Sequence, residues 1–454
     1  MRTATDPGEW AGILALPRSG QVDRGSFLCP GPDRKRVFGM AAALHAALAA
    51  DGENGPVCVA TNDRALLAAA LLAGLAGGPP LLLPPGLSGR ILEQMRKQTG
   101  FQTIITDRRD RLPPALAGMA LQPDQEDRGV LPSGCRPEAE LLRIFTGGST
   151  GSPQVWSKTG LNIFAEALYL ARHFGITDQD RIVATVPPWH IYGLLFSVVL
   201  PLVSGAGVVS GMPGFPADIG ATIREQRATV LAAVPAHYRA LRNHPLDSST
   251  LRLAVSSAGM LDESDSLAFF RQNRVEVVEV YGSTETGGIA TRNRAAGESC
   301  FRAFATVRWQ IRSGLLAVSS PYLSPDLDLD EDGFFLTADR AEAAGQGFLL
   351  RGRADGVTKV GGKRVDLDQV RQVIRAHPGV IDCVVLALPE DSGRGHRIGA
   401  LVQGGNIDPS ALQAHLRQEL EPHARPRILK TVDEMPLREN GKYDRQAILA
   451  LLER

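Results

Sequence analysis

The chain has 454 residues, of which 44% are hydrophobic and 22% are charged. This is ordinary globular composition, and it excludes a disordered or collagen-like chain. Basic and acidic residues both number 49, so the formal net charge is zero. A protein that binds nucleic acid by neutralising phosphates usually carries a basic excess, so this class of protein is not expected. At about 150 residues a domain, the length fits roughly three domains' worth of sequence.

The cysteines and the apolar stretches indicate a reduced compartment and no membrane span. The five cysteines lie far apart without a Cys-x-x-Cys pair, which favours small core residues over disulfides or a zinc site. The start of the chain lacks the apolar core of a signal peptide. The uncharged stretch from Ala65 to Leu83 is interrupted by two glycines and two prolines, which predicts a buried helix followed by a short strand. We expect a soluble, cytoplasmic protein.

Short apolar runs alternate with helical stretches up to about residue 300. Helices are expected from Arg64 and over residues 90–98. The expected strands are residues 57–60, 81–83, 103–105, 182–186, 207–209, 230–234 and 253–256. This alternation predicts an α/β fold with layered sheets, much of it parallel.

The pattern changes after about residue 300. Strands at 314–318, 333–337 and 349–353 predict a small β region. From Ala354 a unit of mixed α and β pattern follows, with a helix over 367–377 and a strand over 383–388. We therefore expect a large N-terminal domain, 1–353, and a smaller α+β C-terminal domain, 354–454.

The first motif with chemical meaning is Phe145-Thr146-Gly147-Gly148-Ser149-Thr150-Gly151-Ser152-Pro153-Gln154, which follows an apolar run. Its glycines let the backbone approach an anion, while N–H and O–H groups donate to it. A Walker loop is excluded because the Gly-Lys-Ser/Thr ending is absent. Taken alone, the motif fits a phosphate-binding loop or a flexible turn.

The second motif is Tyr281-Gly282-Ser283-Thr284-Glu285-Thr286-Gly287-Gly288, which follows the apolar run 275–278. Ligands bind at the carboxyl ends of strands in open α/β sheets. Tyr281 is suited to stacking on a nucleobase, and Glu285 to holding Mg²⁺ beside phosphates. The alternative is an ordinary turn with a solvated acid.

The third motif joins Thr337-Ala338-Asp339 to the segment Arg351–Asp355. A carboxylate that accepts from both hydroxyls of a ribose is a common sugar clamp. A surface ion pair between Asp339 and an arginine is the alternative, and such pairs stabilise little.

The fourth motif is Pro436-Leu437-Arg438-Glu439-Asn440-Gly441-Lys442. Asn-Gly is a turn signal, so Lys442 is expected at a loop tip. A lone lysine near the end of a chain is otherwise a solvated surface residue.

In order and spacing, the four motifs resemble those of the adenylate-forming superfamily, which includes acyl-CoA synthetases, carrier-protein adenylation domains and firefly luciferase. The resemblance extends from the helix after Arg64 to Arg445. Three of only seven lysines, Lys359, Lys363 and Lys442, fall inside the motif regions. The resemblance implies a large adenylation domain and a small, mobile C-terminal domain.

The resemblance also implies a role for each matching position. Catalysis would depend on Lys442, Glu285, Thr146 and His190, with Glu285 also holding Mg²⁺. Asp355 would be the hinge of the C-terminal domain, and Gly361 and Gly362 would line a pantetheine tunnel. The residues implied in binding ATP or AMP are Thr146, Gly147, Gly148, Ser149, Thr150, Gly151, Ser257, Ala258, Gly259, Tyr281, Gly282, Ser283, Thr284, Asp339, Arg353 and Lys442.

The implied activity is ATP-dependent activation of a carboxylic acid as an acyl adenylate, followed by transfer to a pantetheine thiol. Catalysis of phosphoryl chemistry rests on positioning and on preorganised cations, and a lysine ammonium suits this role. Three positions depart from the family pattern: Gln154 replaces a lysine, Ala338 a glycine and Arg438 a threonine. The chain is also short for an acyl-CoA synthetase, as if trimmed at its N-terminus.

The sequence says less about which carboxylic acid is the substrate than about the reaction. The expected acyl pocket contains His190, Tyr192, Val234, Pro235, Gly287 and Gly288. Glycines at 287 and 288 would leave room for a flat or long acyl group. The segments around His190 and Gly287 look like those of short AMP-ligases from aryl-polyene and related fatty-acid-like gene clusters. The thiol acceptor would be CoA or an acyl carrier protein, which present the same arm.

Two other functions remain open. Gln154 and Ala338 also fit a catalytically degenerate nucleotide-binding protein that serves as a scaffold in a biosynthetic complex. Luciferase-like oxygenation belongs to the same superfamily, but no feature of the sequence favours it.

Overall fold

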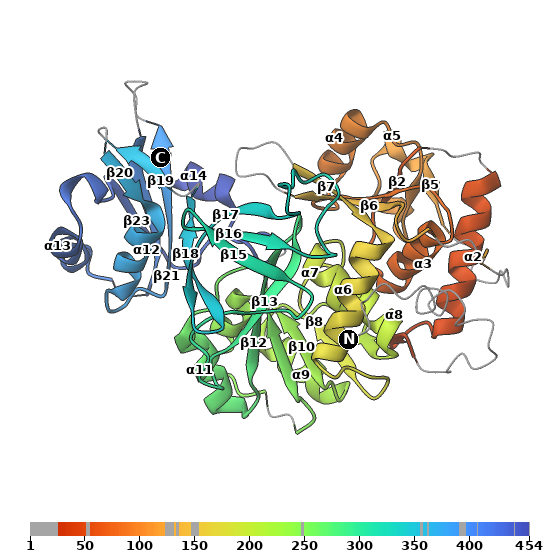
Figure 1. Ribbon diagram of the computed structural model, residues 1–454, viewed down its shortest axis with the longest axis horizontal. Helices are drawn as coiled ribbons and strands as arrows, with labels where there is room; N and C mark the ends of the chain where they lie inside the picture. The colour runs from red at the N-terminus through yellow and green to blue at the C-terminus, as the bar shows by residue number, and fades with distance from the viewer. Residues whose placement is uncertain are drawn as a thin grey trace. The chain divides into compact units, whose positions relative to one another are not determined.

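A computed structural model describes residues 26–50, 55–122, 131–132, 136–146, 154–246, 249–354, 357–360, 363–389, 396–405, 407–439 and 441–453. The chain divides into two compact units (Figure 1). The first contains Met1–Arg308 and Val318–Phe335, and the second contains Trp309–Ala317 and Leu336–Arg454. The boundary expected near Arg353 stays a prediction.

Six strands form the first sheet, in the order β5-β4-β2-β3-β6-β7. The strands are β2 (Val57–Val59), β3 (Leu81–Leu83), β4 (Ile104–Ile105), β5 (Ala120–Leu121), β6 (Glu140–Thr146) and β7 (Gln154–Thr159). All pairs are parallel except β6 and β7. β2 and β3 are fully buried, which explains why they read as continuous apolar runs rather than alternating ones.

Eight strands form the second sheet, in the order β1-β9-β8-β10-β11-β12-β13-β14. They are β1 (Leu28–Cys29), β8 (Arg181–Ala184), β9 (Gly207–Val209), β10 (Val230–Ala233), β11 (Leu253–Ser256), β12 (Val277–Ser283), β13 (Gly287–Asn293) and β14 (Arg302–Ala303). The pairs from β1 to β12 are parallel, and the last two are antiparallel. The carboxyl ends of these parallel strands therefore share one edge of the sheet.

Helices accompany both sheets of the first unit. They are α2 (Arg34–Ala50), α3 (Arg64–Leu75), α4 (Gly89–Thr99), η1 (Arg109–Arg111), α5 (Pro114–Ala117), α6 (Gly160–His173), α7 (Ile191–Leu194), the π-helical turn η2 (Leu195–Val199), α8 (Leu200–Ser204), α9 (Pro216–Glu225), α10 (Pro235–Ala240) and α11 (Glu263–Asn273). α3 begins where the Asp63 carboxylate accepts from Ala65 N and Leu66 N, at 2.7 and 3.1 Å. The uncharged stretch is thus a buried helix and a strand, as predicted.

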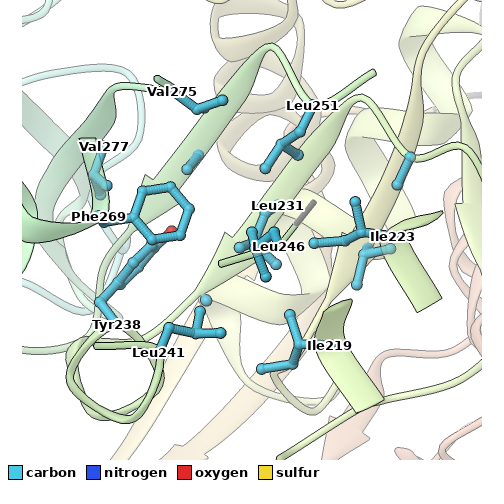
Figure 2. Packing of buried hydrophobic residues seen from close by; sticks show 14 of the residues in the cluster. Ile219, Ile223, Leu231, Tyr238, Leu241, Leu246, Leu251, Phe269, Val275 and Val277 are labelled. Carbon is cyan, nitrogen blue, oxygen red and sulfur yellow. The ribbon is translucent and has the colours of Figure 1, made fainter. Parts of the chain in front are cut away.

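One apolar core lies between the second sheet and its helices (Figure 2). Leu231 and Val277 of the sheet and Ile219 of α9 belong to this cluster, and the ring of Tyr238 meets that of Phe269 edge-on, with centroids 5.2 Å apart. Burial of each such side chain stabilises the fold by about 1.5–3 kcal/mol. This core fixes the strand ends at which the second motif begins.

The second unit contains two small sheets, β19-β20 and β21-β22-β23. It also contains most of a third sheet, β15-β16-β17-β18. The strands are β15 (Arg308–Arg312), β16 (Leu315–Ser319), β17 (Phe335–Ala344), β18 (Gly347–Arg353), β19 (Val357–Val360), β20 (Lys363–Asp366), β21 (Asp382–Pro389), β22 (His396–Gln403) and β23 (Ile428–Val432). Its helices are α12 (Leu367–Ala376), α13 (Pro409–Glu419), η4 (Pro422–Ala424) and α14 (Arg445–Glu453). The expected small β region and the mixed C-terminal pattern are confirmed.

Within the described part of the chain, no helix combines the length and the apolar character that crossing a bilayer requires. Cys29, Cys58 and Cys383 are buried free thiols, as expected, whereas Cys300 is half-buried.

Candidate functional site

The glycine-rich first motif connects two paired strands. Thr146 ends β6 and lies opposite Gln154, the first residue of β7, and its hydroxyl donates to Gln154 O at 3.3 Å. The ends of the loop are therefore held together as a hairpin. The residues between them that were expected to bind phosphate, Gly147, Gly148, Ser149, Thr150 and Gly151, lie outside the described residues.

The second motif is a hairpin rather than a turn that follows a strand. Tyr281, Gly282 and Ser283 lie within β12, and β13 begins at Gly287. The turn is closed by Ser283 and Thr286, whose hydroxyl oxygens are 2.9 Å apart. Glu285 is half-buried at this turn, and its backbone carbonyl accepts from Ser324 N at 2.7 Å. The carboxylate of Glu285 is thus carried by a firmly hydrogen-bonded backbone.

A buried lysine connects the two hairpins. Lys158, on β7, is 1% exposed, and its ammonium donates to Glu285 O at 3.1 Å and Tyr322 O at 2.8 Å. Burial lowers the pKa of Lys158, and the negative charge of Glu166 partly opposes this shift. The sequence analysis gave Lys158 no role. The scarcity of lysine in the chain, seven residues in all, is the signal that could have drawn attention to Lys158.

Gly287 and Gly288 are glycines because the protein itself fills the space beside them. A Cβ at Gly287, where φ is +67°, would lie 2.6 Å from Oε2 of Glu166, and one at Gly288 would lie 2.7 Å from the ring of Phe304. Gly288 N donates to Oε1 of Glu166 at 2.7 Å. The space expected for an acyl group next to these glycines is therefore taken by side chains, and their place in an acyl pocket stays a prediction.

Glu166 lies on α6 and is 2% exposed. Burial raises the pKa of its carboxyl, and the charge of Lys158 and the Gly288 N–H act in the opposite direction. The charges of Lys158 on β7 and Glu166 on α6 thus stabilise each other.

The expected adenine-binding residues lie at the ends of neighbouring parallel strands. Ser257 follows β11, and its hydroxyl donates to Val280 O of β12 at 2.8 Å. Ala258 has a φ of +66°, a left-handed conformation that is unusual for a residue with a side chain. The ring centroid of Tyr281 is 5.5 Å from that of Phe301. This arrangement suits an aromatic ligand laid against the strand ends.

The residues expected around the acyl group lie at the ends of β8 and β10. His190 packs against Trp189, with ring centroids 4.2 Å apart. Tyr192 is buried, and its hydroxyl is 2.8 Å from Val255 O and 3.1 Å from Ala233 O. The hydroxyl of Tyr192 is thus engaged by backbone carbonyls.

Val234 and Pro235 begin α10, and a Cβ at Gly259 would lie 3.5 Å from Pro235 Cγ. On the same helix, His237 Nδ1 is 2.9 Å from the hydroxyl of Thr185. Burial lowers the pKa of His237 to about 4, so its imidazole is neutral at physiological pH. The contact between His237 and Thr185 was not expected from the sequence.

In the second unit, Asp339 and Arg353 are direct partners across β17 and β18. Arg353 Nη1 lies 3.5 Å from Asp339 Oδ1, and Arg353 is 51% exposed. Exposed ion pairs of this kind stabilise a fold little.

Lys442 is exposed on a short hairpin in which Leu437 pairs with Tyr443. Arg438 N donates to Lys442 O at 2.8 Å, and the Tyr443 hydroxyl donates to buried Asp382 at 2.7 Å. The residue next to Lys442 is therefore anchored in the core of the unit. Asp355, Gly361 and Gly362, the expected hinge and pantetheine residues, lie outside the described residues.

The expected metal depends on a single described carboxylate, Glu285. No group of three or more histidine, cysteine or acidic residues able to hold a metal ion occurs among the residues that the structure describes. Mg²⁺ commonly binds through one or two carboxylates together with substrate phosphates and water. Glu285 therefore fits an ion that arrives with ATP.

A cleft of about 670 Å³ lies along the first hairpin and is lined by Glu140, Arg143, Ser157 and Asp326, among others. None of the expected site residues lines it. The motifs, rather than this cleft, define the candidate site.

Comparison with protein families identifies two regions of the chain. A family model described as AMP-binding enzyme matches residues 34–313, and one described as AMP-binding enzyme C-terminal domain matches residues 369–442.

Individual relatives are enzymes named as CoA ligases. Sulfoacetate–CoA ligase of Cupriavidus necator is 27% identical over 69% of this chain and 67% of its own length. A 4-coumarate–CoA ligase of Rhodobacter capsulatus is 30% identical over 68% of this chain and 76% of its own length. The chain thus spans about two thirds to three quarters of these relatives.

Among solved structures, ATP-bound MatB from Rhodopseudomonas palustris matches with a TM-score of 0.81 and 20% identity, covering 97% of this chain and 98% of that one. This likeness confirms the predicted fold class, with its larger N-terminal and smaller C-terminal parts. The predicted enzyme class, AMP-forming acid–thiol ligase, is the class of the named relatives.

Proposed function

Because the chain belongs to the AMP-binding enzyme family, we propose that it activates a carboxylic acid with ATP and passes the acyl group to a pantetheine thiol. The observation that carries the proposal is the connection of two motifs in the first unit. Lys158 joins the strand that ends the glycine-rich loop to the backbone of Glu285. This connection provides the fixed geometry that phosphoryl chemistry requires.

In the proposed first step, a carboxylate oxygen attacks the α-phosphorus of ATP and pyrophosphate leaves. Thr146 and the glycine-rich loop would donate to the phosphates, and Lys442 would place a compact positive charge beside the carboxylate and the α-phosphate. His190 would position the carboxylate of the acid. Mg²⁺, held with Glu285, would neutralise charge on the departing pyrophosphate.

The matching motif residues would hold the nucleoside. Tyr281 would stack on adenine, with Ser257, Ala258 and Gly259 at the neighbouring strand end. Asp339 would accept from the ribose hydroxyls, and Arg353, whose Nη1 lies 3.5 Å from Asp339 Oδ1, would orient this carboxylate.

In the proposed second step, a thiolate attacks the acyl carbonyl carbon and AMP leaves with the bonding electron pair. The C-terminal domain would turn about Asp355, removing Lys442 and bringing Gly361 and Gly362 to the thiol. Closing a domain over the adenylate also excludes water, which would otherwise hydrolyse it.

For the substrate, we propose an aryl or a medium- to long-chain acid, with CoA or an acyl carrier protein as the acceptor. The relatives' names support CoA. Neutral His237 and Thr185 are polar groups near α10 that suit an acid with a hydroxyl or another hydrogen-bonding substituent. We place the enzyme in the cytoplasm, where ATP and CoA are available and thiols stay reduced.

The test is pyrophosphate release with ATP, Mg²⁺ and a panel of aryl and C4–C16 acids. Release that requires both the acid and Mg²⁺ supports the proposal. Absence of release with every acid contradicts it.

The competing proposal is a degenerate nucleotide-binding scaffold. Two residues favour it, namely Gln154, which is exposed at the start of β7, and Ala338. Calorimetry separates the two functions, because tight ATP binding without turnover on any acid, with CoA or carrier protein, supports the scaffold.

A further inference from the structure

A layer of buried polar groups lies beneath the turn that carries Glu285. Lys158 holds the turn at Glu285 O, at 3.1 Å, and Glu166 holds it at Gly288 N, at 2.7 Å. The cation thus binds a carbonyl and the anion binds an N–H, three residues apart on the same turn. Each charge meets the end of a backbone dipole that stabilises it.

The segment 321–326 completes this layer. Lys158 also donates to Tyr322 O at 2.8 Å, and Asn162 Nδ2 donates to Pro321 O at 2.7 Å. Ser324 N donates to Glu285 O at 2.7 Å, and Ser157 N donates to Asp326 Oδ2 at 2.6 Å. The strand of Lys158, the helix of Glu166 and the Glu285 turn therefore share one set of hydrogen bonds.

Stability alone does not explain two buried charges at this place. Removing an ion from water costs several kcal/mol, and apolar residues of similar volume often stabilise a fold as well or better. The glycines of the turn also allow the Glu166 carboxylate to approach the backbone closely. What the charged groups add is a fixed position for the turn.

We propose that Lys158 and Glu166 are positioning residues for the adenylation step, holding the backbone of Glu285 in register with the strand that ends the glycine-rich loop. This inference rests on the proposed function. Neither side chain is assigned a contact with substrate, because both act through the Glu285–Gly288 turn. The pair provides the rigid support that a catalytic carboxylate requires.

The test uses Lys158→Met, Glu166→Gln and the double variant. Each single variant leaves one buried charge without its partner and should lower the melting temperature. The double variant removes both charges and should recover most of this loss. Its turnover in pyrophosphate release should nevertheless stay about 10- to 100-fold below that of the unmodified enzyme, as expected for a displaced catalytic group.

The second readout is the Mg²⁺ concentration at half-maximal activity. We expect it to rise about 10-fold or more in the double variant, while the KM for the acid stays within about two-fold. A residue with a merely structural role would not change the Mg²⁺ dependence of a folded variant. Lys158→Met, which removes the donor to Glu285 O, gives the same readout if the double variant does not fold.

Lys430→Met is the matched control. Lys430, on β23, also donates to a backbone carbonyl, Leu451 O at 3.0 Å, within the second unit. It should change stability without changing the Mg²⁺ dependence. A stable double variant with unchanged turnover and unchanged Mg²⁺ dependence would overturn the inference.

A failure of the proposed function can be told apart from a failure of this inference. If the unmodified protein turns over no acid, calorimetry measures how Mg²⁺ changes its affinity for ATP. The inference then requires that the double variant lose at least about 10-fold of this Mg²⁺-linked gain. An equal gain in both proteins contradicts it.

Discussion

Two adjacent residues of the hairpin at Lys442 have different roles: Lys442 is proposed to act in catalysis, and Tyr443 stabilises the fold. Lys442 is exposed, whereas Tyr443 reaches buried Asp382 and, at 3.3 Å, Arg371. The core contacts of Tyr443 hold the backbone from which the Lys442 side chain extends. The two residues should therefore respond to substitution in opposite ways.

We predict that Lys442→Ala abolishes adenylation while the free energy of unfolding changes by less than about 0.5 kcal/mol, as is usual at exposed positions. Pyrophosphate release and denaturant unfolding measure the two effects. Tyr443→Phe is the control, and it should cost about 1–3 kcal/mol because it leaves the buried Asp382 without its hydroxyl donor. Adenylation at the unmodified rate in Lys442→Ala would show that the lysine is misassigned.

The buried imidazole of His237 predicts a change of stability with pH. Its folded-state pKa, about 4, is below the ordinary value of 6.5, so protonation favours the unfolded chain. Its contribution to stability is complete above pH 6.5 and is lost as the pH falls towards 4. At pH 4.5 the loss is about 2.5 kcal/mol.

The comparison with His237→Gln isolates this contribution. Glu166 acts in the opposite direction, because burial raises its pKa and acid therefore favours its folded form. This effect is present in both proteins and cancels in the difference. Unfolding curves from pH 7 to 4.5 should converge for the two proteins, and parallel curves would exclude a neutral buried His237.

At the scale of elements, the close packing of α6 against β13 predicts a severe effect of Gly287→Ala. The new Cβ would meet Glu166 and Tyr322 at 2.6 and 2.7 Å, in addition to the cost of a positive φ. Gly100→Ala is the matched control, since Gly100 has a φ of +70° and open space around it. Gly287→Ala should be less stable than this control by about 1–3 kcal/mol in denaturant unfolding. If both variants lost the same stability, the Glu166 side chain would move away from the new Cβ at no cost in free energy, contrary to this prediction.

Strands were the elements that the sequence predicted best. Buried parallel strands read as short apolar runs, and the runs at 57–60, 81–83 and 253–256 coincide with β2, β3 and β11. The second motif was placed after a strand, whereas β12 continues through Tyr281 to Ser283. The glycine at 282 suggested a turn rather than a strand. In the structure, glycine is needed there because a Cβ would lie 2.3 Å from Gly287 O of the facing strand β13.

The support of the site could not be predicted from local pattern. Lys158 is held by carbonyls that lie more than a hundred residues away in the chain, at Glu285 and Tyr322. A single sequence shows the lysine but not its burial or its partners. The same holds for His237, whose partner Thr185 lies on another strand end.

On the proposed function, the whole molecule carries out two half-reactions with one chain. The expected adenylation residues occur in both compact units, and the expected hinge is Asp355. We predict that Asp355→Pro spares adenylate formation and suppresses thioester formation by orders of magnitude, because proline fixes φ near −65° and restricts the residue before it. Burst-phase pyrophosphate and transfer to CoA or carrier protein measure the two steps. Equal losses in both would refute the hinge.

The proposed function depends above all on formation of an acyl adenylate by this chain. Its most direct test is mass-spectrometric detection of the adenylate after incubation with ATP, Mg²⁺ and the acid panel in the absence of a thiol. We expect an acyl-AMP with at least one aryl or medium- to long-chain acid. This acyl-AMP should be absent in Lys442→Ala and should give a thioester and AMP when CoA or carrier protein is added. Tight binding of ATP without an acyl-AMP from any acid would contradict the proposed function.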